Sequence, residues 1–117
     1  NELRLFIRDG VGEVDLTIEN GYTSAIIAHG WGSFTLSGHT LSAFLSCSTN
    51  SYCETRGLTV NNNLNVNSNT QGDMYINADV QSLGCKIKQK GNIYFEGTPA
   101  VTSFEYYHEG DIIDLNN

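Results

Sequence analysis

Residues 72–76 read Gly-Asp-Met-Tyr-Ile and residues 91–95 read Gly-Asn-Ile-Tyr-Phe, so the second glycine follows the first by 19 residues. In both stretches a glycine leads into side chains that alternate between the two sides of an extended chain, with Met74 and Ile93 at equivalent positions. Alternation of this kind predicts a β-strand with one buried face. The shared spacing indicates that the two strands are equivalent parts of a repeat.

The same motif recurs through the chain at steps of 19 to 21 residues. Its other leading residues are Gly12, Gly32, Ser51 and Gly110. Each unit has a second alternating segment in its latter half, and no stretch shows the apolar spacing of a helix. A unit of about 20 residues cannot bury its own apolar face, so the units have to stack. The sequence therefore predicts an all-β, single-domain β-solenoid of about six rungs, with a first strand or cap in residues 1–11 and repeats in 12–115.

Stacking also predicts which outward side chains become neighbours. The 19-residue step places Lys86 beside Glu105, as an exposed pair of opposite charges. The 21-residue step of the preceding unit places three asparagines against three lysines. These pairs are Asn65 with Lys86, Asn67 with Lys88, and Asn69 with Lys90.

The composition limits the classes of partner. Thirteen acidic and six basic residues give the 117-residue chain a net charge of −7. We therefore expect neither nucleic-acid binding nor attraction to anionic membranes, and an unaided acidic polysaccharide would be repelled as well. No apolar run reaches the length of about 18 residues that membrane insertion requires. The odd number of cysteines argues against a disulfide-dense fold, and we interpret Cys47, Cys53 and Cys85 as buried small side chains.

The closing segment carries a resemblance to a known bacterial family. Residues 91–101 read Gly-Asn-Ile-Tyr-Phe-Glu-Gly-Thr-Pro-Ala-Val, and a Gly-Asp-Ile strand follows at 110–112. This segment resembles the end of the family described as putative auto-transporter adhesin, head GIN domain. The resemblance spans roughly residues 12–115 and implies a right-handed, single-stranded β-helix, exported to the envelope or surface of a Bacteroidetes-type bacterium. It implies no catalytic residues.

The chain departs from the family pattern at two points. The family has Ser-Gly-Ser-Gly-Asp turns, whereas residues 28–32 read Ala-His-Gly-Trp-Gly and Ser51 replaces a glycine. Family domains are also commonly longer, which leaves open whether further rungs precede residue 1.

A column of oxygen-bearing side chains is the candidate metal site. Stacking aligns Asp73 and Asp111 with Asn92, and oxygen ligands in such a column would suit Ca²⁺. The alternative is that these side chains support their turns through hydrogen bonds to the backbone. We favour this structural role and expect no cofactor, with Ca²⁺ left open.

Two further functions stay open beside a binding role. A pectinase-like β-helix that acts on polysaccharides would need two or three carboxylates close together, but Asp79, Glu96 and Asp114 fall in different parts of the repeat. A protein that binds lipid or another apolar ligand would need a pocket, for which a filled solenoid core leaves little room.

Exposed aromatic residues are the candidate ligand-binding groups. Tyr75 and Tyr94 align one rung apart on the outward face, Trp31 stands between two glycines, and Tyr107 lies near the end of the chain. Such rings stack against sugars, although cross-strand pairing of the tyrosines is an equally simple explanation. We predict a non-enzymatic, exported adhesin-like module that binds a glycan or a cell-surface protein, or acts as a rigid scaffold. Homo-oligomer formation through a solenoid end is left open.

Overall fold

The computed structural model describes residues 3–116, which form strands and connecting corners throughout. The first strand, β1 (Leu3–Thr49), is 47 residues long and winds through more than two repeat units. The later strands are β2 (Tyr52–Val60), β3 (Asn63–Thr70), β4 (Met74–Asn77), β5 (Ser82–Ile87), β6 (Ile93–Glu96), β7 (Val101–Tyr106) and β8 (Ile112–Asp114). All pairings between these eight strands are parallel.

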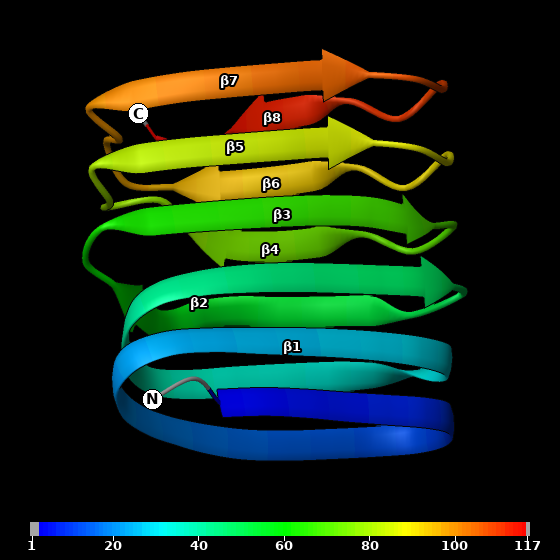
Figure 1. The fold of residues 1–117 in the computed structure, drawn as a ribbon. Helices are drawn as coiled ribbons and strands as arrows, with labels where there is room; N and C mark the ends of the chain where they lie inside the picture. Colours follow the sequence, from blue (N-terminus) through cyan, green and yellow to red (C-terminus); the bar gives the residue numbers. More distant parts are fainter. Residues whose placement is uncertain (1–2, 117) are drawn as a thin grey trace.

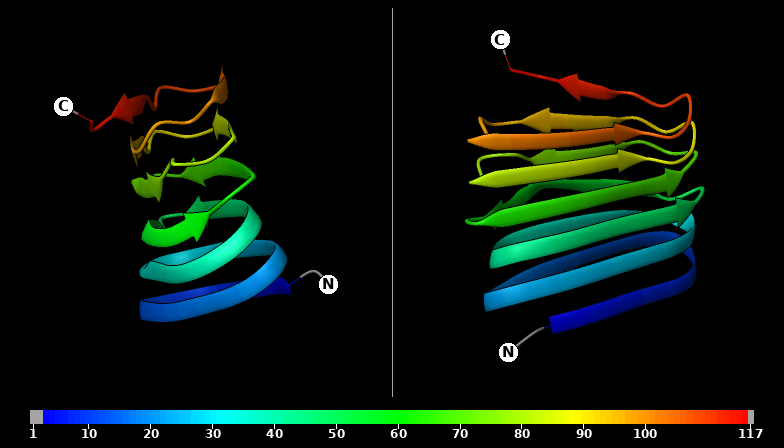
Figure 2. Two further views of the ribbon diagram at one scale, coloured as in Figure 1. Left: turned by 90° about the vertical axis from the view of Figure 1, so that its left-hand side faces the viewer. Right: turned by 45° about the horizontal axis from the view of Figure 1, so that its top comes forward.

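The strands form two walls of a flattened β-solenoid of about six turns, as the sequence predicted (Figure 1). The front wall consists of β3, β5, β7 and the segment of β1 that pairs with β3, residues 43–49. The back wall consists of β2, β4, β6, β8 and the segment of β1 that pairs with β2, residues 33–40. The chain crosses the front from left to right and returns along the back as it climbs, so the winding is right-handed (Figures 1 and 2).

The register confirms the pairings that follow from the 19-residue step. Tyr75 lies opposite Tyr94, and Lys86 lies opposite Glu105 with 3.6 Å between Nζ and Oε2. The predicted pairing of Asn65 with Lys86 is wrong, because Lys86 pairs with Asn67. Asn67 was predicted to pair with Lys88 but pairs with Lys86, and the same register sets Asn69 beside Lys88 in place of Lys90.

The error arises because the two extra residues of the long unit enter before β3. On β2, Thr55 and Arg56 together lie opposite the single residue Leu36, which adds one residue through a bulge. The corner between β2 and β3 adds the second. The 21-residue step therefore relates β3 to β1, while β5 follows β3 at 19 residues.

The core lies between the two walls and is built from the inward side chains of each strand. Phe34, Cys53, Met74 and Ile93 form one inward column, with Cys53 in the position that the repeat predicts. All four are buried, with exposures of 4% or less. Burial of this apolar column is what the alternation in each unit provides.

The leading glycines are the points where consecutive turns touch. A Cβ added at Gly91 would collide with the carbonyl oxygen of Gly72, and one added at Gly110 would collide with that of Gly91. Gly72 makes the same approach to Ser51, and Gly32 to Gly12, where the added atom would lie 2.6 Å from the oxygen. Side chains have no room at these positions, which explains why the motif begins with glycine.

Ser51 is the exception, and hydrogen bonds accommodate it. Its side chain is fully buried, and its hydroxyl lies 2.7 Å from the Ser48 carbonyl oxygen and 3.3 Å from that of Gly30. A buried hydroxyl with carbonyl partners avoids most of the desolvation cost.

The walls are also joined by a covalent bond. Cys47 on the front-wall segment of β1 and Cys53 on β2 form a disulfide across the corner between them. The expectation that all three cysteines are buried is confirmed, but the pairing was not foreseen. Cys85 stays a thiol, and burial raises its pKa to about 12, so it remains protonated and unreactive.

Replacing one of the leading glycines is expected to destabilise the solenoid strongly. Gly91→Ala should lower the free energy of unfolding by about 3 kcal/mol or prevent folding, because the added carbon meets backbone that cannot move aside. Gly21→Ala is the matched control, since nothing lies within 4 Å of its added carbon, and it should change stability by no more than about 0.5 kcal/mol. Urea unfolding measures the free energy of unfolding of both variants. Equal stabilities would contradict the claim that the leading glycines are required for the close contact between turns.

Removing the disulfide should lower stability by about 2 kcal/mol, the value expected for a short closed loop. The Cys47→Ala/Cys53→Ala variant and the reduced wild type should show similar losses in urea unfolding. Reductant should leave the double variant unchanged, because Cys85 has no disulfide to lose. A wild type that is indifferent to reductant would show that the bond contributes nothing.

Candidate functional site

The two predicted tyrosines form a stack on the back wall. The rings of Tyr75 and Tyr94 are 4.8 Å apart between centroids and only 12° from parallel. The guanidinium carbon of Arg56 lies 4.8 Å from the Tyr75 centroid. Since β2 and β6 flank β4 on opposite sides, Arg56 and Tyr94 cover opposite faces of Tyr75. This ring therefore presents its edge to solvent, which favours the cross-strand explanation for the pair.

Arg56 also links two carboxylates across three strands. Its guanidinium donates to Glu54 through Nε and Nη2, and its Nη1 lies 2.9 Å from Glu96 Oε1. The three side chains are 38% to 51% exposed, so solvent screens the pairs. Partial burial opposes ionisation of Glu54, but the hydrogen bonds and charge of Arg56 outweigh it and hold the pKa of this carboxyl below its ordinary value.

Arg56, Glu54 and Glu96 together form the Arg56 clamp, which binds carboxylates that a polysaccharide hydrolase would need to be free. Asp79 and Glu96, which the repeat places apart, line one polar hollow together with Arg56 and Asn116. Glu96 is held by the Arg56 guanidinium, and Asp79 Oδ1 accepts a hydrogen bond of 2.8 Å from the backbone N–H of Thr98. The observed contacts favour a structural clamp over an acid and base pair.

The candidate metal column is a hydrogen-bonded ladder. Asp73 Oδ1 accepts a hydrogen bond of 3.0 Å from the backbone N–H of Asn92, and Asn92 Oδ1 accepts one of 2.8 Å from that of Asp111. The Asp111 carboxylate accepts a bond from the N–H of Ile112. These contacts support the turn-stabilising explanation. Within residues 3–116 no three His, Cys, Asp or Glu side chains are grouped to hold a metal ion.

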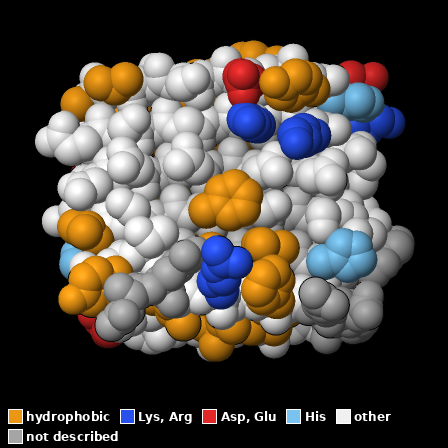
Figure 3. All heavy atoms as spheres, viewed as in Figure 1, with side chains coloured by type: hydrophobic (Ala, Val, Ile, Leu, Met, Phe, Trp, Pro, Cys, Tyr) orange, Lys and Arg blue, Asp and Glu red, His pale blue; other side chains and the backbone are white. Residues whose placement is uncertain are grey.

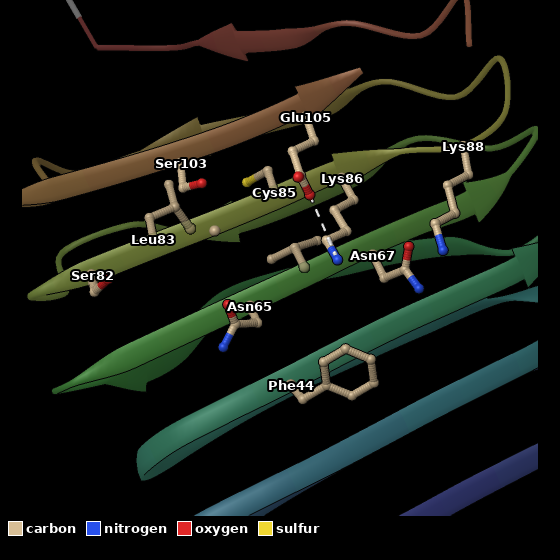
Figure 4. A pocket seen from close by; sticks show the side chains of 12 residues that line it. Phe44, Asn65, Asn67, Ser82, Leu83, Cys85, Lys86, Lys88, Ser103 and Glu105 are labelled. Atoms are coloured by element: carbon tan, nitrogen blue, oxygen red, sulfur yellow. Dashed lines mark ion pairs between the residues drawn. The ribbon is translucent and has the colours of Figure 1, made fainter. Parts of the chain in front are cut away.

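A hollow of about 400 Å³ opens on the front wall. Phe44, Asn65, Gly84 and Ser103 form one outward column of the ladder, and the missing side chain at Gly84 leaves a gap in it (Figure 4). The aromatic ring of Phe44, which is 37% exposed, bounds the hollow toward the N-terminal side. The result is a recess bordered by an aromatic ring, an amide and a hydroxyl.

Charged side chains border the same hollow. Lys86, Lys88 and Glu105 line it (Figure 4), and Figure 3 shows basic and acidic side chains gathered in the upper part of this face. Lys88 is exposed, and its ammonium group has no ion-pair or hydrogen-bond partner within the described chain. Asn67 lies beside Lys86, and its Oδ1 atom is buried without a hydrogen-bond partner among residues 3–116. The hollow thus combines a cation and an acceptor that the protein itself does not satisfy.

The predicted aromatic residues do not converge on one site. Tyr107, which is 62% exposed, extends the front wall beside Lys88, because its N–H donates to the Ile87 carbonyl. Tyr75 and Tyr94 lie on the back wall. The side chain of Trp31 lies outside the described residues. Sequence reasoning missed Gly84 and Arg56, although the 19-residue step does place Gly84 beside Asn65.

Comparison with protein families identifies the chain. The model of the family "Putative auto-transporter adhesin, head GIN domain" matches residues 2–99. The chain belongs to this family. The matched range includes the Gly-Asn-Ile-Tyr strand and most of the corner that follows it, so the resemblance seen in that segment is confirmed. The chain is accordingly an adhesin-like β-helix module.

A solved structure shows the same fold. The crystal structure of a putative adhesin from Bacteroides fragilis NCTC 9343 superimposes with a TM-score of 0.74 at 22% sequence identity. The match covers 96% of this chain and 56% of that chain, so this chain spans little more than half of that protein's length. No curated protein matches the sequence. Residues 3–116 contain no helix that is long and apolar enough to cross a membrane.

The Arg56 clamp should make stability depend on pH. Because the pKa of Glu54 is lowered in the folded state, the pair stabilises the protein above the pKa of the unfolded chain, and this contribution disappears as pH falls through the folded value. Arg56→Gln should lower the free energy of unfolding by about 1 kcal/mol at neutral pH and flatten the acid-induced loss. Urea unfolding from about pH 7 to about pH 3 measures both effects.

Lys86→Gln is the control for this experiment, since it breaks a single exposed ion pair of 3.6 Å. It should alter stability by no more than about 0.5 kcal/mol. Identical acid profiles for wild type and Arg56→Gln would show that the clamp does not stabilise the back wall.

Proposed function

We propose that the chain is a non-enzymatic adhesin module that binds a glycan at the front wall. The observation that carries this proposal is the hollow at Gly84, where an aromatic ring, an amide and a hydroxyl border a gap in the sheet surface. Sugar rings pack against aromatic side chains while their hydroxyls bond to amide and hydroxyl groups. Phe44 supplies the apolar contact, and Asn65 and Ser103 supply the polar ones.

Export to the cell surface or outer envelope fits the same function. The family and the solved neighbour are both described as adhesins. The disulfide between Cys47 and Cys53 adds support, since disulfides persist in oxidising compartments such as the periplasm and the cell exterior. A glycan on another cell or in the surrounding matrix is the partner that this location provides.

The Tyr75 and Tyr94 stack is the second candidate surface. The hydroxyl of Tyr94 accepts a hydrogen bond of 3.2 Å from Asn92 Nδ2, so polar groups flank the ring edges. A flat sugar would have to contact edges here, because Arg56 and Tyr94 cover the faces of Tyr75. The front wall offers the better complement to a sugar ring, and one experiment compares the two surfaces.

A glycan array with the purified domain tests the proposal. We expect reproducible binding by the wild type that falls about tenfold in Phe44→Ala, the loss expected for one aromatic contact. Gly84→Val should weaken binding as well, because the new side chain fills the gap and displaces Asn65, whose Oδ1 would lie 2.7 Å from the added Cβ. The Tyr75→Ala/Tyr94→Ala variant should retain binding, and melting curves should confirm that each variant is folded.

The other outcomes separate the remaining functions. An array without hits would overturn glycan binding and direct the search to a cell-surface protein partner or a scaffold role. Loss of binding only in the tyrosine variant would move the site to the back wall. Cleavage of a bound glycan would restore the pectinase-like alternative, and a hit that requires Ca²⁺ would restore Asp73 and Asp111 as ligands.

A further inference from the structure

All three lysines of the chain fall within residues 86–90, and two of them line the front-wall hollow. We infer that this hollow takes a carboxylate-bearing sugar, with Lys88 and Lys86 binding the acid group and Phe44 contacting the ring. The inference rests on the proposed glycan site and specifies its ligand class.

Lys88 is the primary anion-binding group. Its ammonium has no partner among the described residues, and it stands two residues from Lys86 on the same face of the wall. Alternate residues of a strand are about 7 Å apart, so flexible lysine side chains at these positions can converge on one carboxylate. Figure 4 shows both side chains along the same rim of the hollow.

Lys86 already holds a carboxylate in this position. Its Nζ is 3.6 Å from Glu105 Oε2, and the two side chains are 52% and 46% exposed. A pair this exposed is weak, so a ligand carboxylate can share or replace Glu105 at small cost. The Glu105 carboxylate therefore occupies the place beside Lys86 that the acid group of the ligand would take.

The remainder of the hollow suits the sugar that carries the acid. The hollow of about 400 Å³ places Phe44 beside Asn65, whose Oδ1 lies over Gly84, and Ser103, so that the aromatic ring can contact a sugar ring while the amide and the hydroxyl bond to its hydroxyls. Asn67 adds a buried Oδ1 without a partner, and an unsatisfied acceptor gains from any donor that reaches it. The acid must sit directly on the ring, because the lysines border the same hollow that holds it.

The net charge of −7 opposes an acidic ligand at long range but not at contact. Screening limits exposed charges to about 8 Å at physiological ionic strength, so the two lysines dominate the field at the hollow. The acid group is thus attracted locally although the chain as a whole repels it, and we expect binding to weaken as salt is added.

The test uses trigalacturonate and α2,3-sialyllactose, each compared with its methyl ester, together with the sulfated sugars of the same array. Titration calorimetry should show binding to at least one free acid that falls about tenfold or more on esterification, since a charge-assisted contact is lost. Lys88→Gln should cause a similar loss. Lys90→Gln removes the same charge from a lysine that does not line the hollow, and it should leave the affinity within about twofold.

The results distinguish this inference from the function on which it rests. Binding of neutral sugars only, or equal binding of an acid and its ester, would overturn the carboxylate assignment and leave glycan binding intact. Preference for sulfated over carboxylated sugars would also overturn it. An array without any hit would overturn both, and equal losses in Lys88→Gln and Lys90→Gln would show a general charge effect in place of a site.

Discussion

The solenoid depends on the close contact of backbone with backbone at its column of leading small residues. At Gly91 and Gly110 a side chain would collide with the carbonyl oxygen of the turn below, so the close approach of consecutive turns at these two positions requires glycine. This contact fixes each turn relative to the next at one corner of the repeat. Because a one-residue slip would exchange the two faces of a strand, that fixed corner also decides which side chains form the core.

The same constraint explains how much of the molecule could be predicted. Where the unit length is regular, sequence spacing translates directly into contact, and Tyr75 meets Tyr94 as Lys86 meets Glu105. The fold follows from this regularity together with the alternation in each unit. The asparagine pairing failed because a bulge at Arg56 and a longer corner shift the chain before β3, and no local pattern marks where such extra residues enter.

The features of the candidate site depend on details that spacing alone conceals. The hollow exists because Gly84 supplies no side chain to its column, so its position is known only when the register of β3 with β5 is known. Arg56, which lies at the bulge of β2, reaches across β4 to Glu96, 40 residues away, and the regular spacing does not predict this contact. The disulfide joins residues on two walls, and its formation depends on a corner whose path the spacing of six residues does not reveal.

The polar side chains of the back wall bind one another, whereas some of those on the front wall have no partner within the described residues, and this difference supports the proposed site on the front wall. On the back wall Arg56 meets both carboxylates and one ring face, and the Tyr75 ring is covered on both sides, so these groups gain little from a ligand. On the front wall Lys88 and the Asn67 oxygen have no partners within residues 3–116, and both residues line the hollow. Polar groups left unsatisfied around a recess gain free energy when a ligand supplies their partners. The chain has only six basic residues, and one of them, Lys88, lines the hollow without a partner among residues 3–116, which supports the proposal of a binding surface there; the contacts of the aromatic stack instead fit a structural role.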